Sequence, residues 1–350
     1  MSKFFTYTGS LLVLAAAIIA AVGAGSVAVP LSEIIKVIIA HVTPFSPAVD
    51  SVHDSIIGDV RLPRVLLAGL VGASLAISGA AFQGLLQNPL ADPYTLGVSS
   101  GASVGAVLVL FLGISFPVFS MVTLPIMSIL TAVLTLLFVI TFARMLDQTL
   151  SIETLILTGI VLGSFLGSVI SLMIALTGDE LRQIVGWLLG SVAMRGWNFV
   201  SLLVPFFVIG SLLLLIQGQE LNAMSLGEER AKQLGVPTEK RKAVILLAAS
   251  ILTGAAVAVS GTIGFVGLVV PHICRKLFGV DHRHLLPLSL INGATFLILA
   301  DLVSRTIIAP VELPIGVITS LIGAPIFALI LYQQRKERST HRKRRGAVHD

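Results

Sequence analysis

The chain contains many runs of about 20 apolar residues, the length an α-helix needs to cross the hydrocarbon core of a membrane. Only 12% of its 350 residues are charged and its mean hydropathy is +0.99, whereas a soluble domain carries roughly 25% charged residues. We therefore predict an all-α integral membrane protein with about ten transmembrane helices. The predicted spans are residues 4–27, 64–84, 97–114, 118–142, 152–176, 198–217, 243–261, 263–279, 285–303 and 314–332.

The basic residues predict the orientation of these spans. An even number of spans places both termini on one side, and 17 of the 23 Lys and Arg residues fall on that side. Cytoplasmic loops are enriched in Lys and Arg, so we expect both termini in the cytoplasm. The expected organisation is a transmembrane domain at 1–334 followed by a basic cytoplasmic tail at 335–350. The first apolar run is too long for a cleaved signal peptide, so we interpret it as a retained helix.

The sequence also resembles itself at a shift of 182 residues. Ten of the 29 positions from 70 to 98 are identical to their counterparts from 252 to 280, without a gap. These segments begin in the second and seventh spans, so the two halves would be inverted in the membrane, an arrangement common in transporters. Shared Gly, Ala and Leu content is the alternative explanation. Small residues at three- or four-residue spacing would also let these helices pack closely.

A cytoplasmic loop at about 218–242 carries the signals of a short helix. Ser225 to Glu228 fits a capping box, in which a Ser hydroxyl and a Glu carboxylate bind backbone N–H groups at the helix start. Gly235 and Pro237 are typical of a helix end. Ala231 and Leu234 would form a small apolar face. Lipid cannot cover a helix in this position, so it would pack on its own bundle or be presented to a cytoplasmic protein.

Three arginines are expected at the outer ends of spans, against the general charge bias: Arg61, Arg64 and Arg305. They would either be anchors that extend toward the headgroups or bind carboxylates of an extracytoplasmic partner. On the cytoplasmic side, two X-Pro steps should hold Asn88 and Asp92 outside the α region. That segment would be either a simple turn or part of a gate.

Several classes of function find no support in the sequence. There is no GxxxxGK[ST] loop for binding ATP, and no catalytic constellation, so we expect neither enzymatic activity nor a cofactor. His272, His282 and His284 lie beside basic residues without the spacing of metal ligands, so we predict no metal site. Cys274 is the single cysteine, which excludes an intrachain disulfide. No basic face with interleaved aromatic residues indicates nucleic-acid binding.

An ion-coupled secondary transporter is the main alternative class. Such a protein should carry ionisable groups at mid-membrane. Only Asp301 and Glu153 lie near span interiors, and both are close to predicted helix ends, so the sequence disfavours this class.

Four long blocks, residues 61–102, 226–237, 260–275 and 300–327, resemble the FecCD-type permeases. These are the membrane subunits of ABC importers for ferric siderophores, haem and cobalamin, and the resemblance extends from about residue 10 to 332. It implies a type II ABC importer permease fold in the cytoplasmic membrane of a prokaryote. It also implies a homodimer or a pair of related permeases, two cytoplasmic ATPase subunits and an extracytoplasmic binding protein.

The resemblance further implies roles for individual residues. Positions that match the ATPase-coupling segment are Gly227, Glu228, Glu229, Ala231, Leu234 and Gly235, and those that match the binding-protein contacts are Arg61, Arg64 and Arg305. Asn88 and Leu90 match the cytoplasmic gate. Residues 151–153 read Ser-Ile-Glu where small hydroxyl residues would suit a second gate, so no role is carried over to them. The expected substrate is an iron(III)-siderophore complex, with cobalamin or haem as alternatives.

Overall fold

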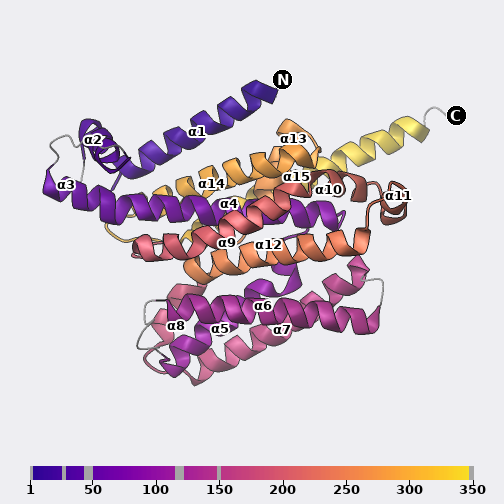
Figure 1. The fold of residues 1–350 in the computed structure, drawn as a ribbon, viewed down its shortest axis with the longest axis horizontal. Helices are drawn as coiled ribbons and strands as arrows, with labels where there is room; N and C mark the ends of the chain where they lie inside the picture. Colours follow the sequence, from indigo (N-terminus) through magenta and orange to yellow (C-terminus); the bar gives the residue numbers. More distant parts are fainter. Residues whose placement is uncertain (1–2, 26–28, 43–49, 115–121, 148–150, 347–350) are drawn as a thin grey trace.

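The computed structural model describes residues 3–25, 29–42, 50–114, 122–147 and 151–346. All regular elements within these ranges are helices, and most of the long ones run side by side along the horizontal of Figure 1. In chain order they are α1 (Lys3–Gly23), α2 (Leu31–Val42), α3 (Ser51–Ser55), the π-helix η1 (Ile56–Arg61), α4 (Leu62–Leu85), the 3-10 helix η2 (Pro93–Leu96), α5 (Val98–Leu112), α6 (Thr123–Leu146), α7 (Ile152–Leu176), α8 (Leu181–Leu188), α9 (Gly196–Ile216), α10 (Gly218–Met224), α11 (Glu228–Gln233), α12 (Thr238–Ser260), α13 (Val266–Phe278), α14 (His282–Thr306) and α15 (Ile315–Gly346).

The predicted all-α membrane architecture is confirmed, although the spans differ in length. Seven helical segments in the described chain are long and apolar enough to cross a membrane: α1, the continuous segment 51–85, α6, α7, α9, α12 and α14. Two further apolar helices are shorter, α5 and the part of α15 from Ile315 to Ile330. The predicted span 263–279 is α13, which has 13 residues. At about 1.5 Å per residue it reaches only part of the way across a core of about 30 Å.

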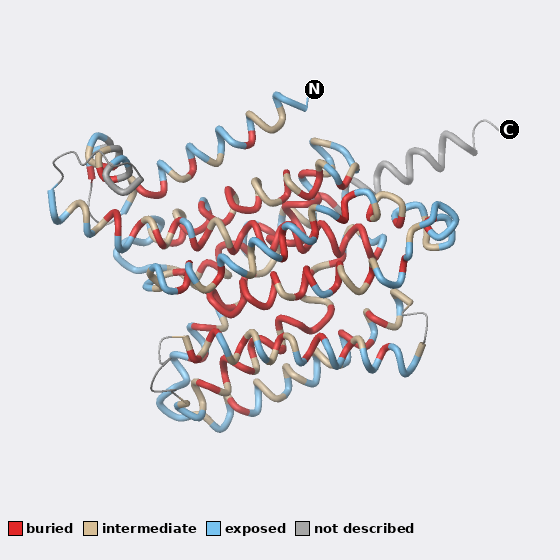
Figure 2. Tube along the Cα trace, in the orientation of Figure 1, coloured by how far each residue is buried: buried red, intermediate tan, exposed pale blue. Residues whose placement is uncertain are grey.

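Helix α4 lies at the centre of the bundle. It packs against α14, α12, α13 and α9, and 89% of the most apolar window in the segment 51–85 is buried. Figure 2 shows these central helices mostly buried and the peripheral ones mixed. A Cβ added to Gly79 in α4 would lie only 1.8 Å from the carbonyl oxygen of Gly267 in α13. The small residues of α4 therefore do what their spacing predicts, because they allow two backbones to touch.

The two helices that begin the predicted repeat are neighbours and run in opposite directions. α4 leads from the end of the bundle that carries α3 and α8 to the end that carries α10 and α11, and α12 leads back (Figure 1). We call these the α8 end and the α11 end. Opposite directions for α4 and α12 are what an inverted repeat requires. Tyr7, near the start of α1, lies 3.1 Å from His284 at the start of α14, and α15 points toward the side of Figure 1 that carries α11.

The periphery exposes large apolar side chains. In α7 only 11% of the most apolar window is buried, and Leu157, Val161 and Phe165 are exposed along one face. Together with Phe138 and Phe142 of α6 they line an apolar groove. Such a surface would be unfavourable in water, so its natural neighbours are lipid chains or another apolar helix.

Candidate functional site

The short helix α11 stands at the tip of the α11 end, between α10 and α12 (Figure 1). It ends in a Schellman motif: Gly235 has φ +84°, the N–H of Val236 donates to the carbonyl of Ala231 at 3.0 Å, and that of Gly235 donates to Lys232 at 2.9 Å. A left-handed residue at this position strongly favours glycine. The predicted helix end at Gly235 is confirmed.

The predicted capping box at the start of this helix is wrong. The N-cap is Gly227, with φ +106° and no side-chain hydrogen bond. The hydroxyl of Ser225 instead donates to the carbonyl of Asn222 at 2.7 Å, because Ser225 lies at the end of the preceding helix α10. The carboxylate of Glu228 is likewise engaged elsewhere.

Glu228 connects α11 to α12 through a nearly buried lysine. Its Oε2 lies 2.5 Å from Nζ of Lys242, whose side chain is 2% exposed. Its Oε1 lies 3.2 Å from Nζ of Lys232 and accepts a hydrogen bond of 3.3 Å from Thr238. Partial burial pushes the pKa of Glu228 upward, but the hydrogen bonds and charges of the two lysines outweigh it, so the pKa lies below its ordinary value. The sequence signals did not reveal this ion pair.

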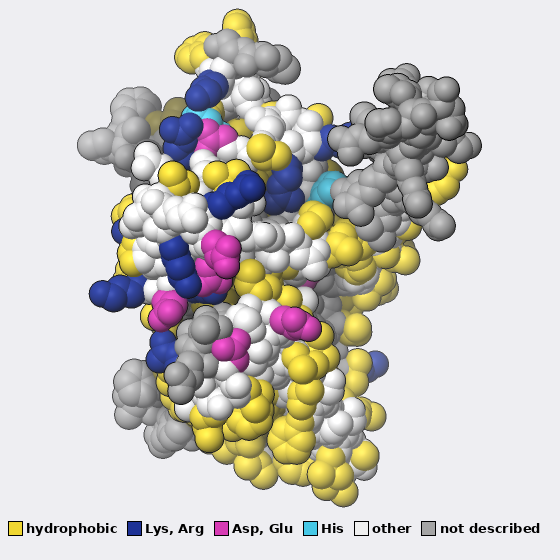
Figure 3. All heavy atoms as spheres, turned by 90° about the vertical axis from the view of Figure 1, so that its right-hand side faces the viewer, with side chains coloured by type: hydrophobic (Ala, Val, Ile, Leu, Met, Phe, Trp, Pro, Cys, Tyr) yellow, Lys and Arg dark blue, Asp and Glu magenta, His cyan; other side chains and the backbone are white. Residues whose placement is uncertain are grey.

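The two apolar residues of α11 do not share a face. Ala231 is fully buried against the bundle, whereas Leu234 is 66% exposed, so the predicted joint apolar face is wrong. Leu226, just before the helix, is also exposed, as is Glu229. Figure 3 looks onto this end and shows acidic and basic side chains gathered on it. The helix thus combines one anchored side with an exposed side that carries Leu234.

The turn after α4 also lies at the α11 end, and it is non-helical as predicted. Asn88 Oδ1 accepts a hydrogen bond from the N–H of Leu90 at 2.9 Å, and Asp92 has extended backbone angles while it caps η2 through Tyr94. Gln87 donates to the carbonyl of Met224 in α10 at 2.7 Å. Asn88 and Leu90 are both exposed. The turn is therefore tied to α10, which leads directly into the α11 segment.

The three predicted docking arginines meet at the α8 end, where they line one pocket of about 480 Å³. Arg64 is the most heavily paired. Its Nε and Nη2 donate to Asp301 at 3.0 and 2.9 Å, and its Nη1 donates to Glu312 at 2.8 Å. The carboxylate of Asp301 is 1% exposed, so two donors from one guanidinium satisfy it inside the bundle.

The other two arginines bind the C-terminal end of α1. Arg61 donates from Nη1 to the carbonyls of Val22 and Gly23 at 2.9 and 3.0 Å. Arg305 donates to the carbonyl of Ala21 and lies 3.5 Å from Asp301. Arginine near the C-terminus of a helix is favourable because its charge opposes the negative end of the helix dipole. The structure thus brings the three arginines together and gives each a partner within the chain; their role in docking stays a prediction.

Asp301 and Glu312 belong to this cluster, although the sequence did not reveal it. The sequence alone places Asp301 only near a span interior. Its i,i+4 spacing to Arg305 in α14 was the one local signal available. The bond to Arg64 spans 237 positions of sequence, so no local pattern could indicate it.

The histidines near the α11 end have separate environments. Nδ1 of His282 lies 2.8 Å from Oδ1 of Asn222, and Nδ1 of His284 lies 3.1 Å from the hydroxyl of Tyr7. His272 is buried in α13. Among the described residues no group of three His, Cys, Asp or Glu side chains is arranged to hold a metal ion.

Comparisons with known proteins identify the family of this chain. The sequence profile of the FecCD transport family matches residues 12–333. The chain belongs to the FecCD transport family. It is 57% identical over 338 residues to an ABC transporter permease protein of Bacillus subtilis (strain 168), which bears the description uncharacterized; the alignment covers 96% of this chain and 95% of that protein. Members of the FecCD family are ABC importer permeases, so the chain is one as well.

A solved structure and a second relative extend the comparison. The chain superposes with a TM-score of 0.81 on a metal-chelate type ABC transporter in an inward-facing conformation, at 36% identity, covering 93% of this chain and 98% of that one. The cobalamin import permease of Halobacterium salinarum is 40% identical, with 84% of this chain and 78% of that protein covered. Other FecCD relatives are named for import of hemin, molybdate, iron(3+)-hydroxamate and Fe(3+) dicitrate.

Proposed function

We propose that this permease carries an iron(III)-siderophore complex across the cytoplasmic membrane of a prokaryote. The observation that supports this most directly is the likeness to a metal-chelate type ABC transporter over 93% of the chain. Two relatives at 38% and 39% identity are named for Fe(3+) dicitrate and iron(3+)-hydroxamate. A ferric chelate is therefore the cargo that the structural likeness and these two relatives support together.

In this proposal residues 1–334 form the permease domain, residues 335–350 form a cytoplasmic tail, and the α11 end faces the cytoplasm. Two ATPase subunits would contact it around α11. The distribution of charge supports this orientation, because cytoplasmic ends are enriched in Lys and Arg. ATP would be hydrolysed in those separate subunits, and their closure would move α11. The Glu228–Lys242 bond would pass that movement to α12, and the turn with Asn88 and Leu90 would act as the cytoplasmic gate.

The α8 end would receive the extracytoplasmic binding protein, and a second permease copy or a related permease would complete the pathway. Arg61, Arg64 and Arg305 already have partners within the chain, so an incoming carboxylate would have to share or displace them. Glu312 is the partner that is easiest to displace, since its side chain is 44% exposed and exposed ion pairs contribute little.

Transport by the reconstituted complex tests the cargo. The permease, its ATPase and its binding protein would be placed in proteoliposomes and offered ⁵⁵Fe-labelled ferric hydroxamate, ⁵⁵Fe-labelled hemin or ⁵⁷Co-labelled cobalamin at equal concentrations. ATP-dependent accumulation of the ferric hydroxamate alone is the expected result. Accumulation of cobalamin or hemin in its place would contradict the proposed substrate but not the importer class.

Cobalamin is the second candidate, since import permeases named for it are 40–42% identical to this chain. The same assay decides between the two, because each labelled ligand is offered to the same preparation. Haem is a further alternative in the same family and is covered by the hemin arm.

A further inference from the structure

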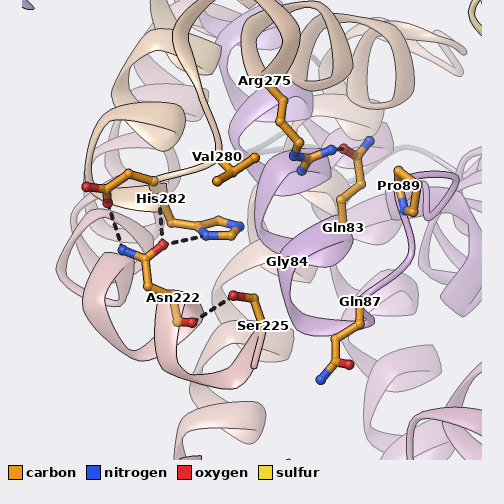
Figure 4. Close-up of a pocket in the computed structure, with 10 residues that line it drawn as sticks. Gln83, Gly84, Gln87, Pro89, Asn222, Ser225, Arg275, Val280 and His282 are labelled. Atoms are coloured by element: carbon orange, nitrogen blue, oxygen red, sulfur yellow. Dashed lines mark hydrogen bonds between the residues drawn. The ribbon is translucent and has the colours of Figure 1, made fainter. Parts of the chain in front are cut away.

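A second pocket opens at the α11 end, beside the segment that carries α11. It has a volume of about 610 Å³ and lies between the end of α4, helix α10 and the α13–α14 connection (Figure 4). Arg275 and Gln83 form one wall, and Asn222 and His282 form the opposite wall. Exposed Val280 stands at the rim. The pocket therefore combines polar walls with an apolar rim.

The guanidinium of Arg275 is held in place by a neutral group. Gln83 is buried, and its Nε2 donates to the carbonyls of Gly267 and Leu268 at 3.3 and 3.2 Å. These two bonds fix the orientation of the amide, so that its Oε1 faces Arg275 and accepts a hydrogen bond from Nη1 at 3.0 Å. Gln83 positions the charge of Arg275 but does not neutralise it.

No carboxylate of the described chain lies within ion-pair distance of Arg275, that is, within 4.0 Å. The nearby Arg283 is different, because its Nη2 lies 2.6 Å from Asp281. Asp281 also lines the pocket, but its oxygens already accept hydrogen bonds from Arg283 and Asn222. A partly buried guanidinium without a counter-charge is unfavourable, and an incoming anion would relieve this.

The opposite wall is rigid. Asn222 Oδ1 accepts from the backbone N–H of His282 at 2.8 Å and lies 2.8 Å from its Nδ1, while the amide nitrogen of Asn222 donates to Asp281 at 2.7 Å. The ring is directed toward Gly84, where an added Cβ would lie 2.4 Å from Nε2. These bonds fasten α10 to the start of α14, so the shape of the pocket is set before any partner arrives.

We propose that this pocket receives an acidic side chain of the cytoplasmic ATPase subunit, as a docking contact in addition to α11. The inference rests on the proposed function, because it requires the α11 end to face the ATPase. Three observations favour a protein carboxylate: the position beside α10, the unneutralised Arg275, and the apolar rim at Val280. Protein interfaces commonly place an apolar contact beside a hydrogen-bonded charge pair.

The test compares two arginines of the same end. The permease would be placed in nanodiscs of neutral phosphatidylcholine, and the dissociation constant for its ATPase would be measured for the natural chain and for Arg275→Gln, Arg275→Lys and Arg283→Gln. We expect Arg275→Gln to weaken binding about ten- to a hundredfold, the range for losing a charged hydrogen bond, and Arg275→Lys to weaken it less. Arg283→Gln removes the same charge from a pair that is complete within the chain, so we expect a change below about twofold.

Equal effects of Arg275→Gln and Arg283→Gln would overturn the proposal. The proposal would also be overturned if Arg275→Gln left the ATPase affinity unchanged but lost phosphatidylglycerol that the natural chain retains through purification. That result would identify a lipid headgroup site. Thermal unfolding checks the fold of each variant. A double-mutant cycle with single Asp→Asn and Glu→Gln changes on the ATPase gives a second readout: we expect one carboxylate whose loss makes binding insensitive to Arg275, and finding none would contradict the proposal. If the natural chain bound no ATPase, the proposed function itself would fail.

Discussion

Nζ of Lys242 lies 2.5 Å from Oε2 of Glu228, and this bond joins the first residue of α11 to the first turns of α12. The lysine side chain is almost completely buried, so water cannot replace the carboxylate. Helix α11 has only six residues, too few to be stable alone. Its place therefore depends on this bond and on the buried methyl group of Ala231.

Replacing Glu228 with Gln should loosen α11. The buried ammonium of Lys242 loses its closest anion, and the loss of a charged hydrogen bond of this kind costs about 1–3 kcal/mol. Hydrogen exchange at the amides of 230–236 should accelerate accordingly. Glu229→Gln is the matched control, because Glu229 is exposed and its loss should change the exchange rates little. Equal rates in both variants would show that the Lys242 pair does not hold the helix.

The same pair predicts a pH dependence. The pKa of Glu228 lies below its ordinary value of 4.5, so its contribution is fully present above that value and is lost as the pH falls through the lower folded pKa. Protection of the α11 amides, corrected for intrinsic exchange, should stay constant between pH 8 and 6 and fall below about pH 4.5. The fall should be absent in Glu228→Gln; its persistence there would assign it to another group.

Asp301→Asn should destabilise the whole bundle. It removes the carboxylate shared by Arg64 and Arg305 in a site that is almost closed to water, and breaking a buried pair costs about 3–5 kcal/mol. The midpoint of thermal unfolding in detergent should fall clearly. Glu312→Gln affects the same arginine from a half-exposed position and should cost less than about 1 kcal/mol. A similar midpoint for the two variants would contradict the central role of Asp301.

Two glycine substitutions separate packing from helix propensity. Gly79→Ala would place a methyl group against the carbonyl of Gly267 and force α4 and α13 apart, at a cost of about 1–3 kcal/mol. Gly167→Ala in α7 would meet no atom within 4 Å and should be neutral, or more stable by up to about 1 kcal/mol, because alanine favours helices. Unfolding midpoints of the isolated chain in detergent would decide the comparison.

Leu234→Glu tests the proposed contact with the ATPase. The side chain is 66% exposed, so the fold should change by less than about 0.5 kcal/mol. ATPase binding should weaken about fivefold or more if Leu234 is buried at the interface, with a matching loss of uptake. Gln233→Glu adds the same charge to the neighbouring exposed position and serves as the control. Normal uptake by the Leu234 variant would exclude α11 as the coupling element.

The sequence predicts the apolar spans well because hydropathy is a local property of each segment. The structure has a helix within each predicted span. The end of α11 was also predictable, because the left-handed residue that ends it strongly favours glycine, and Gly235 is that residue. The predicted capping box at Ser225 is wrong because a hydroxyl at the end of one helix can donate to a carbonyl of that helix instead of accepting from an N–H group of the next helix. The local sequence pattern does not indicate that α10 extends to Met224 and leaves Ser225 as its last capping residue.

The contacts that organise both ends of the bundle were beyond sequence reasoning for another reason. Each of these contacts joins residues of different helices, which no local spacing rule connects: Arg64 with Asp301, Glu228 with Lys242, and Gln83 with Arg275. The positions of Arg61, Arg64 and Arg305 at outer span ends, and their match to a family pattern, do not reveal how firmly this chain already holds each of them. Local pattern likewise could not separate Ala231 from Leu234, because the direction in which the short helix packs decides which of the two is covered.

The backbone contact between Gly79 and Gly267 also restricts how the molecule can move. Two surfaces that meet without side chains between them have no flexible layer to absorb sliding, so we expect α4 and α13 to move together as one rigid unit through a transport cycle. Helices would instead move relative to one another where packing is loose, along the exposed face of α7 and against the neighbour that covers it. The conformational change of the transporter would then be a rigid-body rotation of whole groups of helices rather than a shear between adjacent helices of the core.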